Sequence, residues 1–146
     1  MKRNRKAILI GVFVVLGVLA AWYFDLSGIP SAIPHQLEAL PKKTNLRCYV
    51  CSLGGFIDRE YIWRLDGPPE AIAAVIKQLE MQESATIPKS FWKMRPYYWP
   101  RSTSEGMKPY RTINFNDDDR GSDGEHFFLL HDTKANRAFV WFRDNF

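Results

Sequence analysis

The amino-acid sequence predicts an α+β protein, with a single N-terminal transmembrane helix followed by a small ββαβββ domain. We expect a mainly antiparallel sheet with one helix packed on it. Three observations support this class: an uncharged apolar run at residues 7–24, a stretch with helical periodicity at residues 72–79, and several short segments rich in aromatic and β-branched residues. The length of 146 residues suits one domain preceded by a short segment.

The apolar run reads AILIGVFVVLGVLAAWYF and contains neither a charge nor a proline. As a helix it would be about 27 Å long, close to the ~30 Å hydrocarbon core of a bilayer. Four basic residues precede it: Lys2, Arg3, Arg5 and Lys6. Because basic flanks stay in the cytoplasm, we expect residues 1–24 to be a single-pass signal anchor at the cell membrane, with the C-terminal domain extracytoplasmic. A cleaved secretory signal is the alternative, since Val18–Ala20 offers small residues to a peptidase.

Residues 25–43 contain Pro30, Pro34 and Pro41, each of which fixes φ and removes a backbone donor. We expect a semi-extended linker here and a folded domain over residues 44–146. All sixteen acidic residues and sixteen of the twenty basic ones follow the apolar run. The exported part is therefore neutral, and its charge gives no argument for a nucleic-acid partner.

The first two elements of the domain are strands, expected at residues 46–53 and 59–65. The second alternates, with Tyr61, Trp63 and Leu65 on one face and polar residues on the other, so we expect it to be half-buried.

A helix follows at residues 68–82. Its apolar residues recur at helical spacing, and they are Ile72, Val75, Ile76 and Leu79. Gly67 is expected as the N-cap and Pro68 as the first helical residue.

Residues 84–109 are interrupted by prolines and predict a long, irregular, aromatic-rich loop, followed by a strand at residues 110–115. Runs at residues 125–132 and 137–142, separated by Thr133–Asn136, predict a hairpin. Both runs are apolar at odd and even positions, which indicates central strands covered on both faces. We expect the helix to cover one face and the aromatic loop the other.

The aromatic loop is the best candidate for a functional surface, because residues 91–101 interleave five aromatic rings with three cations. Such a segment can stack on a glycan or a protein partner. The candidate binding residues are Trp92, Arg95, Tyr97, Tyr98 and Trp99. We expect Trp92 to be buried and the other three rings to be partly exposed. The alternative is that the rings only cover the sheet.

Cys48 and Cys51 form a Cys-Tyr-Val-Cys motif. This spacing suggests two hypotheses, a redox pair or a structural disulfide. A redox site of this kind needs a helix N-terminus after its first cysteine, whereas Tyr49 and Val50 favour a strand. Buried, unpaired thiols are therefore an equal alternative.

Two metal sites are conceivable from the residue types. A zinc site would join the two cysteines to His126 and His131, but 74 residues separate the pairs and a strand would split the histidines between faces. A calcium site would use Asp117, Asp119 and Asp123, but the spacing matches a calcium-binding loop poorly, and we favour a solvated loop.

No nucleophile elbow, phosphate-binding loop or dinucleotide fingerprint occurs in the sequence. We therefore expect a non-catalytic binding module of the cell envelope, without a cofactor, whose partners are the bilayer (through residues 7–24) and an envelope protein or glycan. The alternatives are an exported thiol redox protein and a calcium- or sugar-binding module.

Overall fold

The structure, a computed structural model, describes residues 10–19, 29–38, 40, 44–53, 59–96, 99–113, 115 and 124–145. Over these residues the protein is α+β, as predicted. The strands are β1 (Ile29–Ser31), β2 (Arg47–Leu53), β3 (Arg59–Asp66), β4 (Gln82–Glu83), β5 (Met107–Arg111), β6 (Gly124–Asp132) and β7 (Arg137–Asn145). The helical elements of the domain are the 3-10 turn η1 (His35–Leu37), α2 (Pro69–Gln78) and α3 (Lys89–Met94).

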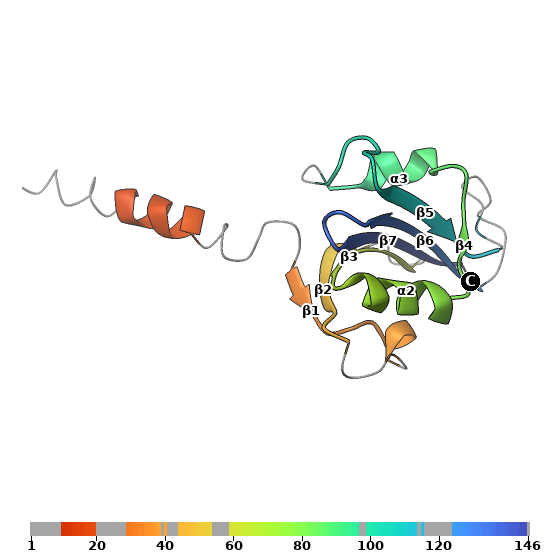
Figure 1. Cartoon of the computed structure of the whole chain (residues 1–146). Coiled ribbons are helices and arrows are strands. Elements are labelled where there is room, and N and C mark those ends of the chain that lie inside the picture. Colours follow the sequence, from red (N-terminus) through yellow and green to blue (C-terminus); the bar gives the residue numbers. More distant parts are fainter. Residues whose placement is uncertain are drawn as a thin grey trace, which may run out of the picture.

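The described strands form one seven-stranded sheet in the order β1-β2-β3-β7-β6-β5-β4, and every neighbouring pair is antiparallel (Figure 1). The sheet consists of two meanders, β1–β3 and β4–β7, joined by α2. The last strand returns to the first meander, because β7 pairs with β3 from Arg59↔Asp144 to Asp66↔Arg137. β3, β7 and β6 are consequently the central strands.

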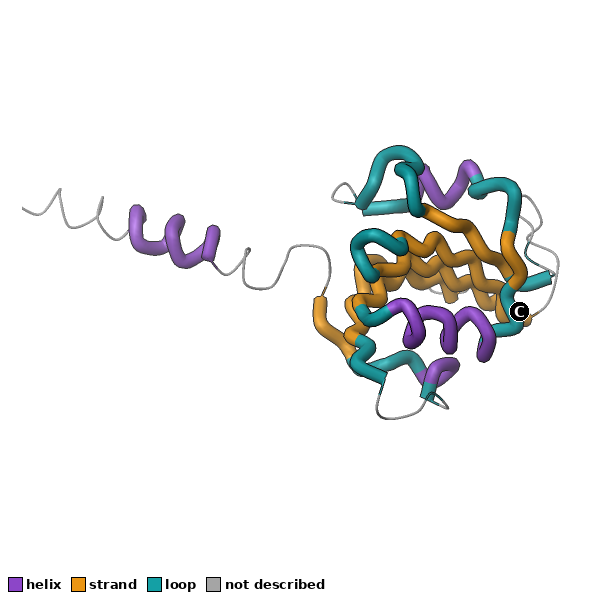
Figure 2. The backbone as a smooth tube through the Cα atoms, viewed as in Figure 1, coloured by secondary structure: helices purple, strands orange, loops and turns teal. Residues whose placement is uncertain are grey.

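Both faces of the sheet are covered, as the two-sided apolar pattern predicts (Figure 2). On one face, α2 and η1 pack on alternate strand residues; the buried core there includes Trp63, Leu65, Ile72, Val75, Phe127, Leu129, Val140 and Phe142. On the other face, α3 and the segments around it cover Ile62, Phe128, Leu130, Phe139 and Trp141. The prediction that the aromatic segment covers this second face is confirmed for Phe91 and Trp99, which are buried there.

Helix α2 is shorter than the predicted 68–82. Pro68, rather than Gly67, is the N-cap, and Pro69 is the first helical residue, a position that needs no N–H donor. The helix ends because Glu80 adopts a φ of 51°, and the Met81 N–H then donates to the Ile76 carbonyl at 3.0 Å. This hydrogen bond satisfies a backbone carbonyl that has no partner within the helix.

The boundary expected between linker and domain is wrong. Ile29–Ser31 pairs with β2, and Leu37 and Leu40 are buried in the core on the α2 face. Pro30 is tolerated because β1 is an edge strand. Burial of Leu37 and Leu40 removes apolar surface from water, and this free energy favours packing of the segment on the core over a solvated linker. The described part of the domain therefore starts at Ile29 rather than near Thr44.

Three further expectations need correction. The loop predicted at residues 84–109 contains helix α3, and the strand predicted at 110–115 is β5, which starts at Met107 and includes Pro109. The Pro109 carbonyl still accepts a hydrogen bond from the Ser84 N–H at 2.9 Å. β3 is not half-buried, because Arg64 on its second face is 1% exposed.

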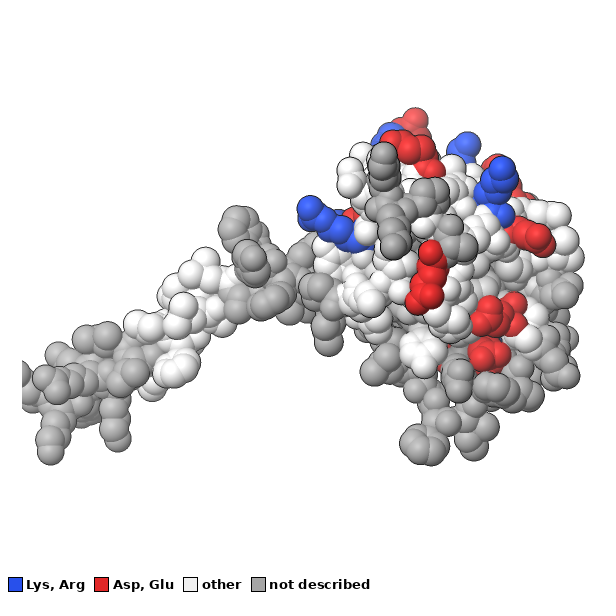
Figure 3. All heavy atoms as spheres, turned by 90° about the horizontal axis from the view of Figure 1, so that it is seen from below, with Lys and Arg blue, Asp and Glu red and all other residues white. Residues whose placement is uncertain are grey.

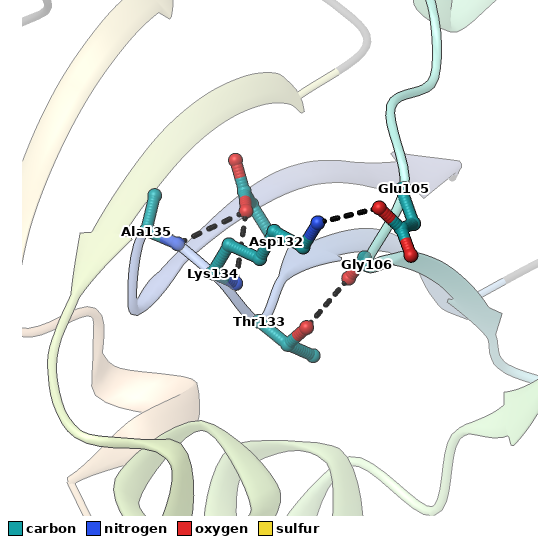
Figure 4. Close-up of polar contacts among 6 residues, drawn as sticks. All are labelled: Glu105, Gly106, Asp132, Thr133, Lys134 and Ala135. Atoms are coloured by element: carbon teal, nitrogen blue, oxygen red, sulfur yellow. Dashed lines mark hydrogen bonds and ion pairs between the residues drawn. The ribbon is translucent and has the colours of Figure 1, made fainter.

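The predicted hairpin between β6 and β7 is confirmed, with its loop at residues 133–136. Asp132 stabilises the turn, because its Oδ1 accepts the N–H groups of Lys134 and Ala135 at 3.1 and 3.0 Å (Figure 4). Thr133 ties the turn to the start of β5: its Oγ1 donates to the Gly106 carbonyl at 2.8 Å.

Residues 10–19 form a helix that lies apart from the domain (Figure 1). Its apolar side chains are between 50% and 70% exposed; they are Ile10, Val12, Phe13, Val14, Val15, Leu16, Val18 and Leu19. Over the described residues, no helix has both the length and the apolar character required to cross a membrane. The predicted transmembrane helix is thus unsupported by the described residues, and residues 7–9 and 20–24 of the apolar run lie outside them.

Candidate functional site

A cavity of about 360 Å³ lies on the α2 face of the sheet, where the segment of residues 31–36 passes over the strands. Its volume is within the ~300–1,000 Å³ range of small-molecule sites. The lining residues are Ser31, Ala32, Ile33, Pro34, His35, Gln36, Val50, Tyr61, Trp63, Glu125, Phe142 and Asp144. The cavity thus combines a segment whose prolines predict a linker with four strands of the sheet.

Three aromatic rings form one wall of this cavity. Tyr61 and Trp63 share a face of β3 because side chains alternate along a strand, and Phe142 joins them because it pairs with Tyr61 across β3 and β7. The ring planes lie between 11° and 22° of parallel, with centroids 5.6 to 6.2 Å apart. This wall is pre-formed, since Trp63 and Phe142 are held in the core.

Two carboxylates also line the cavity. Glu125 on β6 and Asp144 on β7 are direct partners in the antiparallel ladder, so their side chains lie on the same face. Like charges placed opposite each other repel and are destabilising. Arg59 is the direct partner of Asp144 in the β3–β7 ladder, so a basic residue occupies the same row of the sheet as the two acidic ones.

Gln36 connects the rim to the carboxylates. Its Nε2 donates to Glu125 Oε1 at 3.1 Å, and its carbonyl accepts Gln78 Nε2 of α2 at 2.6 Å. Gln36 Oε1 is buried and has no hydrogen-bond partner among the described residues. His35 lies close by, with its Nε2 4.0 Å from Glu125 Oε1 and its side chain 73% exposed. The rim is therefore fixed both to Glu125 and to α2.

The groups of the cavity can form hydrogen bonds and aromatic contacts with a ligand. They are hydrogen-bond acceptors and ring surfaces, and among the described lining residues the only hydroxyls belong to Ser31 and Tyr61. Neither hydroxyl is hydrogen-bonded to a histidine or carboxylate base within the described part of the chain, as a nucleophile requires. Among the described residues, no group of three or more histidine, cysteine or acidic side chains is placed to hold a metal ion.

The candidate residues of the aromatic segment are divided by the structure. Trp99 is 3% exposed and its ring lies 4.6 Å from that of Phe139, so the expectation of a partly exposed Trp99 is wrong. The physical reason is that the ring completes the core on the second sheet face. Tyr97 and Tyr98 lie outside the described residues. Arg95 is half-buried, with Nη1 3.4 Å from the Pro96 carbonyl.

Trp92, which we expected to be buried, is only partly so, and it lines a second, open cavity of about 520 Å³. Arg101 and several hydroxyl-bearing side chains, Thr86, Ser102 and Thr103, share this cavity. Of the predicted aromatic surface, Trp92 therefore remains available to a partner.

The structure describes the side chain of Cys48 but not that of Cys51. Cys48 is a free, buried thiol on the α2 face. Burial raises its pKa, and the side-chain hydrogen bond with Ser31 only partly opposes that effect. A disulfide at Cys48 is thus not formed here. Cys51 lies at the irregularity in the β2–β3 register, and its side chain is outside the described set.

The two histidines do not form a common site. His126 and His131 are both buried in β6, and their odd separation places them on opposite faces, as the strand periodicity predicts. The calcium candidates Asp117, Asp119 and Asp123 lie outside the described residues.

Sequence reasoning did not identify the cavity, although part of it could be found from the hairpin. With a turn at residues 133–136, counting back along both strands pairs Glu125 with Asp144. The contribution of Gln36 gives no such signal, because it depends on how residues 31–36 cross the sheet.

Compared with known proteins, the chain matches no family model, no curated protein and no solved structure.

Proposed function

We propose that the protein is a non-catalytic binding module of the cell envelope, held at the membrane by its N-terminal segment, and that the cavity beside β1 is its binding site. The observation that carries the proposal is the cavity itself: a rigid aromatic wall, two carboxylates and a rim segment that is fixed to α2 surround one space. A concave, mainly apolar cavity with a few polar groups at its edge is typical of ligand-binding sites.

Membrane attachment is supported by the N-terminal residues. Eight apolar side chains of residues 10–19 are at least half exposed, an arrangement that costs free energy in water and is favourable in lipid. The uncharged run that contains them extends over residues 7–24, behind four cations. These features fit an extracytoplasmic domain with a cytoplasmic N-terminus.

The surface charge agrees with this class of function. On the face shown in Figure 3, lysine and arginine side chains are interspersed with acidic ones rather than gathered in a basic patch. This supports a partner other than nucleic acid. The raised pKa of Cys48 weighs against the thiol redox alternative, because a reactive cysteine needs a lowered one.

Fractionation of cells that produce the full chain tests the attachment. Carbonate-washed membranes should retain the protein with residue 1 at its N-terminus, and a reporter fused after Phe146 should be active only when exported. A soluble chain that starts after Ala20 would establish the cleaved signal and overturn the anchor.

A thermal-shift screen tests the binding site, because a ligand of the folded state raises the melting temperature. A genuine ligand should lose its effect in Gln36→Ala, which removes a cavity side chain. It should keep its effect in the matched variant Gln82→Ala, because Gln82 is exposed on β4 at the opposite edge of the sheet. Shifts that are equal in both variants would contradict the proposed site.

A further inference from the structure

We infer that the open cavity lined by Trp92 and Arg101, here called the α3 cavity, binds an acidic sugar, that is, a saccharide unit that carries a carboxylate. This cavity is distinct from the one beside β1, so the inference goes beyond the proposed function and does not depend on it. Three features of the described residues carry it: an accessible tryptophan ring, an exposed arginine with no acidic partner among them, and a lining rich in hydroxyl groups.

Three segments form the walls of the α3 cavity: helix α3, the loop after it and the chain between β4 and α3. All three are fixed to the second face of the sheet, which α3 covers in Figure 2. Helix α3 is held by the buried ring of Phe91, and the loop after it by the buried ring of Trp99. The third segment is held by Ser84, whose N–H donates to the Pro109 carbonyl at 2.9 Å. The walls are therefore pre-formed, which lowers the entropy cost of binding.

Trp92 supplies an aromatic surface. Its ring is only partly buried, and its indole N–H has no hydrogen-bond partner among the described residues. Unlike Nε1 of Trp99, this N–H is not closed off from solvent. The face of an aromatic ring carries partial negative charge, so the C–H groups of a pyranose ring, which carry partial positive charge, pack on it. The indole N–H can in addition donate to a sugar hydroxyl.

Arg101 supplies positive charge beside this ring. Its side chain is exposed, and no ion pair joins it to a described residue. Among the described residues that line the α3 cavity, none is acidic. A guanidinium group can donate two parallel hydrogen bonds to a carboxylate, and such charge-assisted bonds are among the strongest in proteins. The cavity therefore favours an anionic group over a cationic one.

The neighbouring sequence is basic as well. Residues 89–111 contain six lysines and arginines against one acidic residue, Glu105. The Glu105 carboxylate is engaged elsewhere, since its Oε2 lies 2.7 Å from Nζ of Lys134. The nearest acidic residue before the cavity in the chain is Glu83, which does not line it.

The acidic run at residues 117–123 meets the sheet at a different place. It leads into Gly124, where β6 begins, whereas the loop with Arg101 leads into Met107, which pairs with Asp132 at the other end of β6. The two ends of β6 are eight residues apart, or about 26 Å at ~3.3 Å per residue.

Hydroxyl groups make a sugar the preferred anion. Thr86, Ser102 and Thr103 line the α3 cavity, and their hydroxyls form no hydrogen bond with the described part of the chain. A hydroxyl both donates and accepts, so these groups can exchange hydrogen bonds with the several hydroxyls of a saccharide. An acidic peptide presents few hydroxyls and would leave most of this lining unused. The volume of about 520 Å³ is within the range of small-molecule sites.

The test is isothermal titration calorimetry of the full chain in a polyoxyethylene ether detergent, whose headgroup carries neither charge nor sugar. The probes are trigalacturonate, a hyaluronan tetrasaccharide and sialyllactose, each compared with its methyl ester, which keeps the sugar rings and removes the charge. At least one acid should bind, and its ester should bind at least about tenfold more weakly. Absence of binding by all three acids, or equal binding of an acid and its ester, would overturn the inference.

Variants locate the bound sugar. Arg101→Gln and Trp92→Ala should each weaken binding about tenfold. Lys77→Gln removes the same charge from an exposed position on α2, across the sheet, and should leave the affinity unchanged. Arg101→Gln should melt at the parent temperature because its side chain is exposed, which separates loss of affinity from unfolding. Affinities that do not differ between Arg101→Gln and Lys77→Gln would overturn the inference.

Two further measurements distinguish the alternatives. Gln36→Ala, in the cavity beside β1, should not change the binding of acidic sugars. If Gln36→Ala abolishes binding and Arg101→Gln does not, the sugar belongs to the cavity beside β1; the present inference then fails while the proposed function stands. If tetraglutamate binds as tightly as the sugars and depends equally on Arg101, the α3 cavity recognises acidic peptides and the assignment of a sugar is wrong.

Discussion

Asp66 Oδ2 lies 3.0 Å from Nη2 of Arg64, a guanidinium group whose side chain is 1% exposed. The other oxygen of the carboxylate, Oδ1, is 2.9 Å from Nε of Arg137. The guanidinium of Arg64 also lies over the ring of Tyr49, at 4.1 Å from its centroid. Asp66 therefore compensates a buried positive charge at the place where β3 meets β7.

We expect Asp66→Asn to lower the free energy of unfolding by about 2–3 kcal/mol, because it removes the carboxylate charge that lies 3.0 Å from the buried guanidinium of Arg64. The loss is below the upper range for buried pairs since Asp66 is itself 25% exposed. Urea unfolding measures the change, with Glu83→Gln as the control for a lost negative charge. A loss no larger than that of the control would contradict this account of Arg64.

Two tryptophans in the aromatic segment should respond differently to truncation. Trp99→Ala should cost about 3–5 kcal/mol, since the ring is buried against Phe139 and Phe91. Trp92→Ala should cost about 1–2 kcal/mol, because that ring is only partly buried and contacts Phe91 edge-on at 5.5 Å. Chemical denaturation of both variants gives the comparison. Equal costs would place both rings in the core and remove Trp92 as a surface residue.

The two-faced core could be predicted from the sequence because the signal is local. Residues 127–130 are apolar at odd and even positions, and such a strand must be covered on both sides. The hairpin was predictable for the same reason, because the turn residues 133–136 lie directly between the two strands that they join. By contrast, β1 has three residues and includes Pro30, and α3 has six residues, fewer than two helical turns. Neither element is long enough to show a hydrophobic period in the sequence.

The candidate site was less predictable for a different reason. Its carboxylates follow from the register of one hairpin, but its rim depends on a non-local crossing of residues 31–36 over the sheet. Prolines at 30 and 34 are typical of a linker, although the burial of Leu37 fixes this segment to the core. The exposure of Trp99 could not be predicted either, because no local pattern shows which rings of a proline-rich segment reach the sheet.

Burial of His131 should make the stability depend on pH. The imidazole is 6% exposed, and burial lowers its pKa, with Lys108 acting in the same direction and Asp132 opposing. The folded protein then binds this proton less readily than the unfolded chain. Its contribution to stability is present above the ordinary histidine pKa and is lost as the pH falls through the lower, folded value.

We therefore expect the unfolding free energy to decrease between about pH 7 and about pH 5. His131→Gln should flatten this decrease. Urea titrations at several pH values measure the slope. Parallel pH profiles for the parent and His131→Gln would show that this histidine is not responsible.

Gly106 should be intolerant of a side chain. Its φ is 95°, and a Cβ would lie 3.0 Å from Thr133 Oγ1, the group that donates to the Gly106 carbonyl (Figure 4). Gly124 has a similar φ of 108°, but a Cβ there would meet no atom of the described residues within 4 Å. Gly124→Ala should therefore cost about 1–2 kcal/mol from backbone strain alone, and Gly106→Ala more than that. Melting temperatures of the two variants measure the difference; a smaller loss in Gly106→Ala would contradict the packing of the turn on β5.

The thiol of Cys48 should be unreactive while the protein is folded. Burial raises its pKa, so the folded state holds the thiol proton more firmly than the unfolded chain does. In a Cys51→Ser background, which leaves Cys48 as the sole thiol, we expect alkylation by iodoacetamide at about pH 8 to be at least tenfold slower than in urea-unfolded protein. By the same linkage, the stabilising contribution of this group is lost as the pH rises from the ordinary thiol pKa through the raised one. Alkylation of the folded protein at the unfolded rate would show an accessible thiolate, and would restore the thiol redox function as the leading alternative to a binding module.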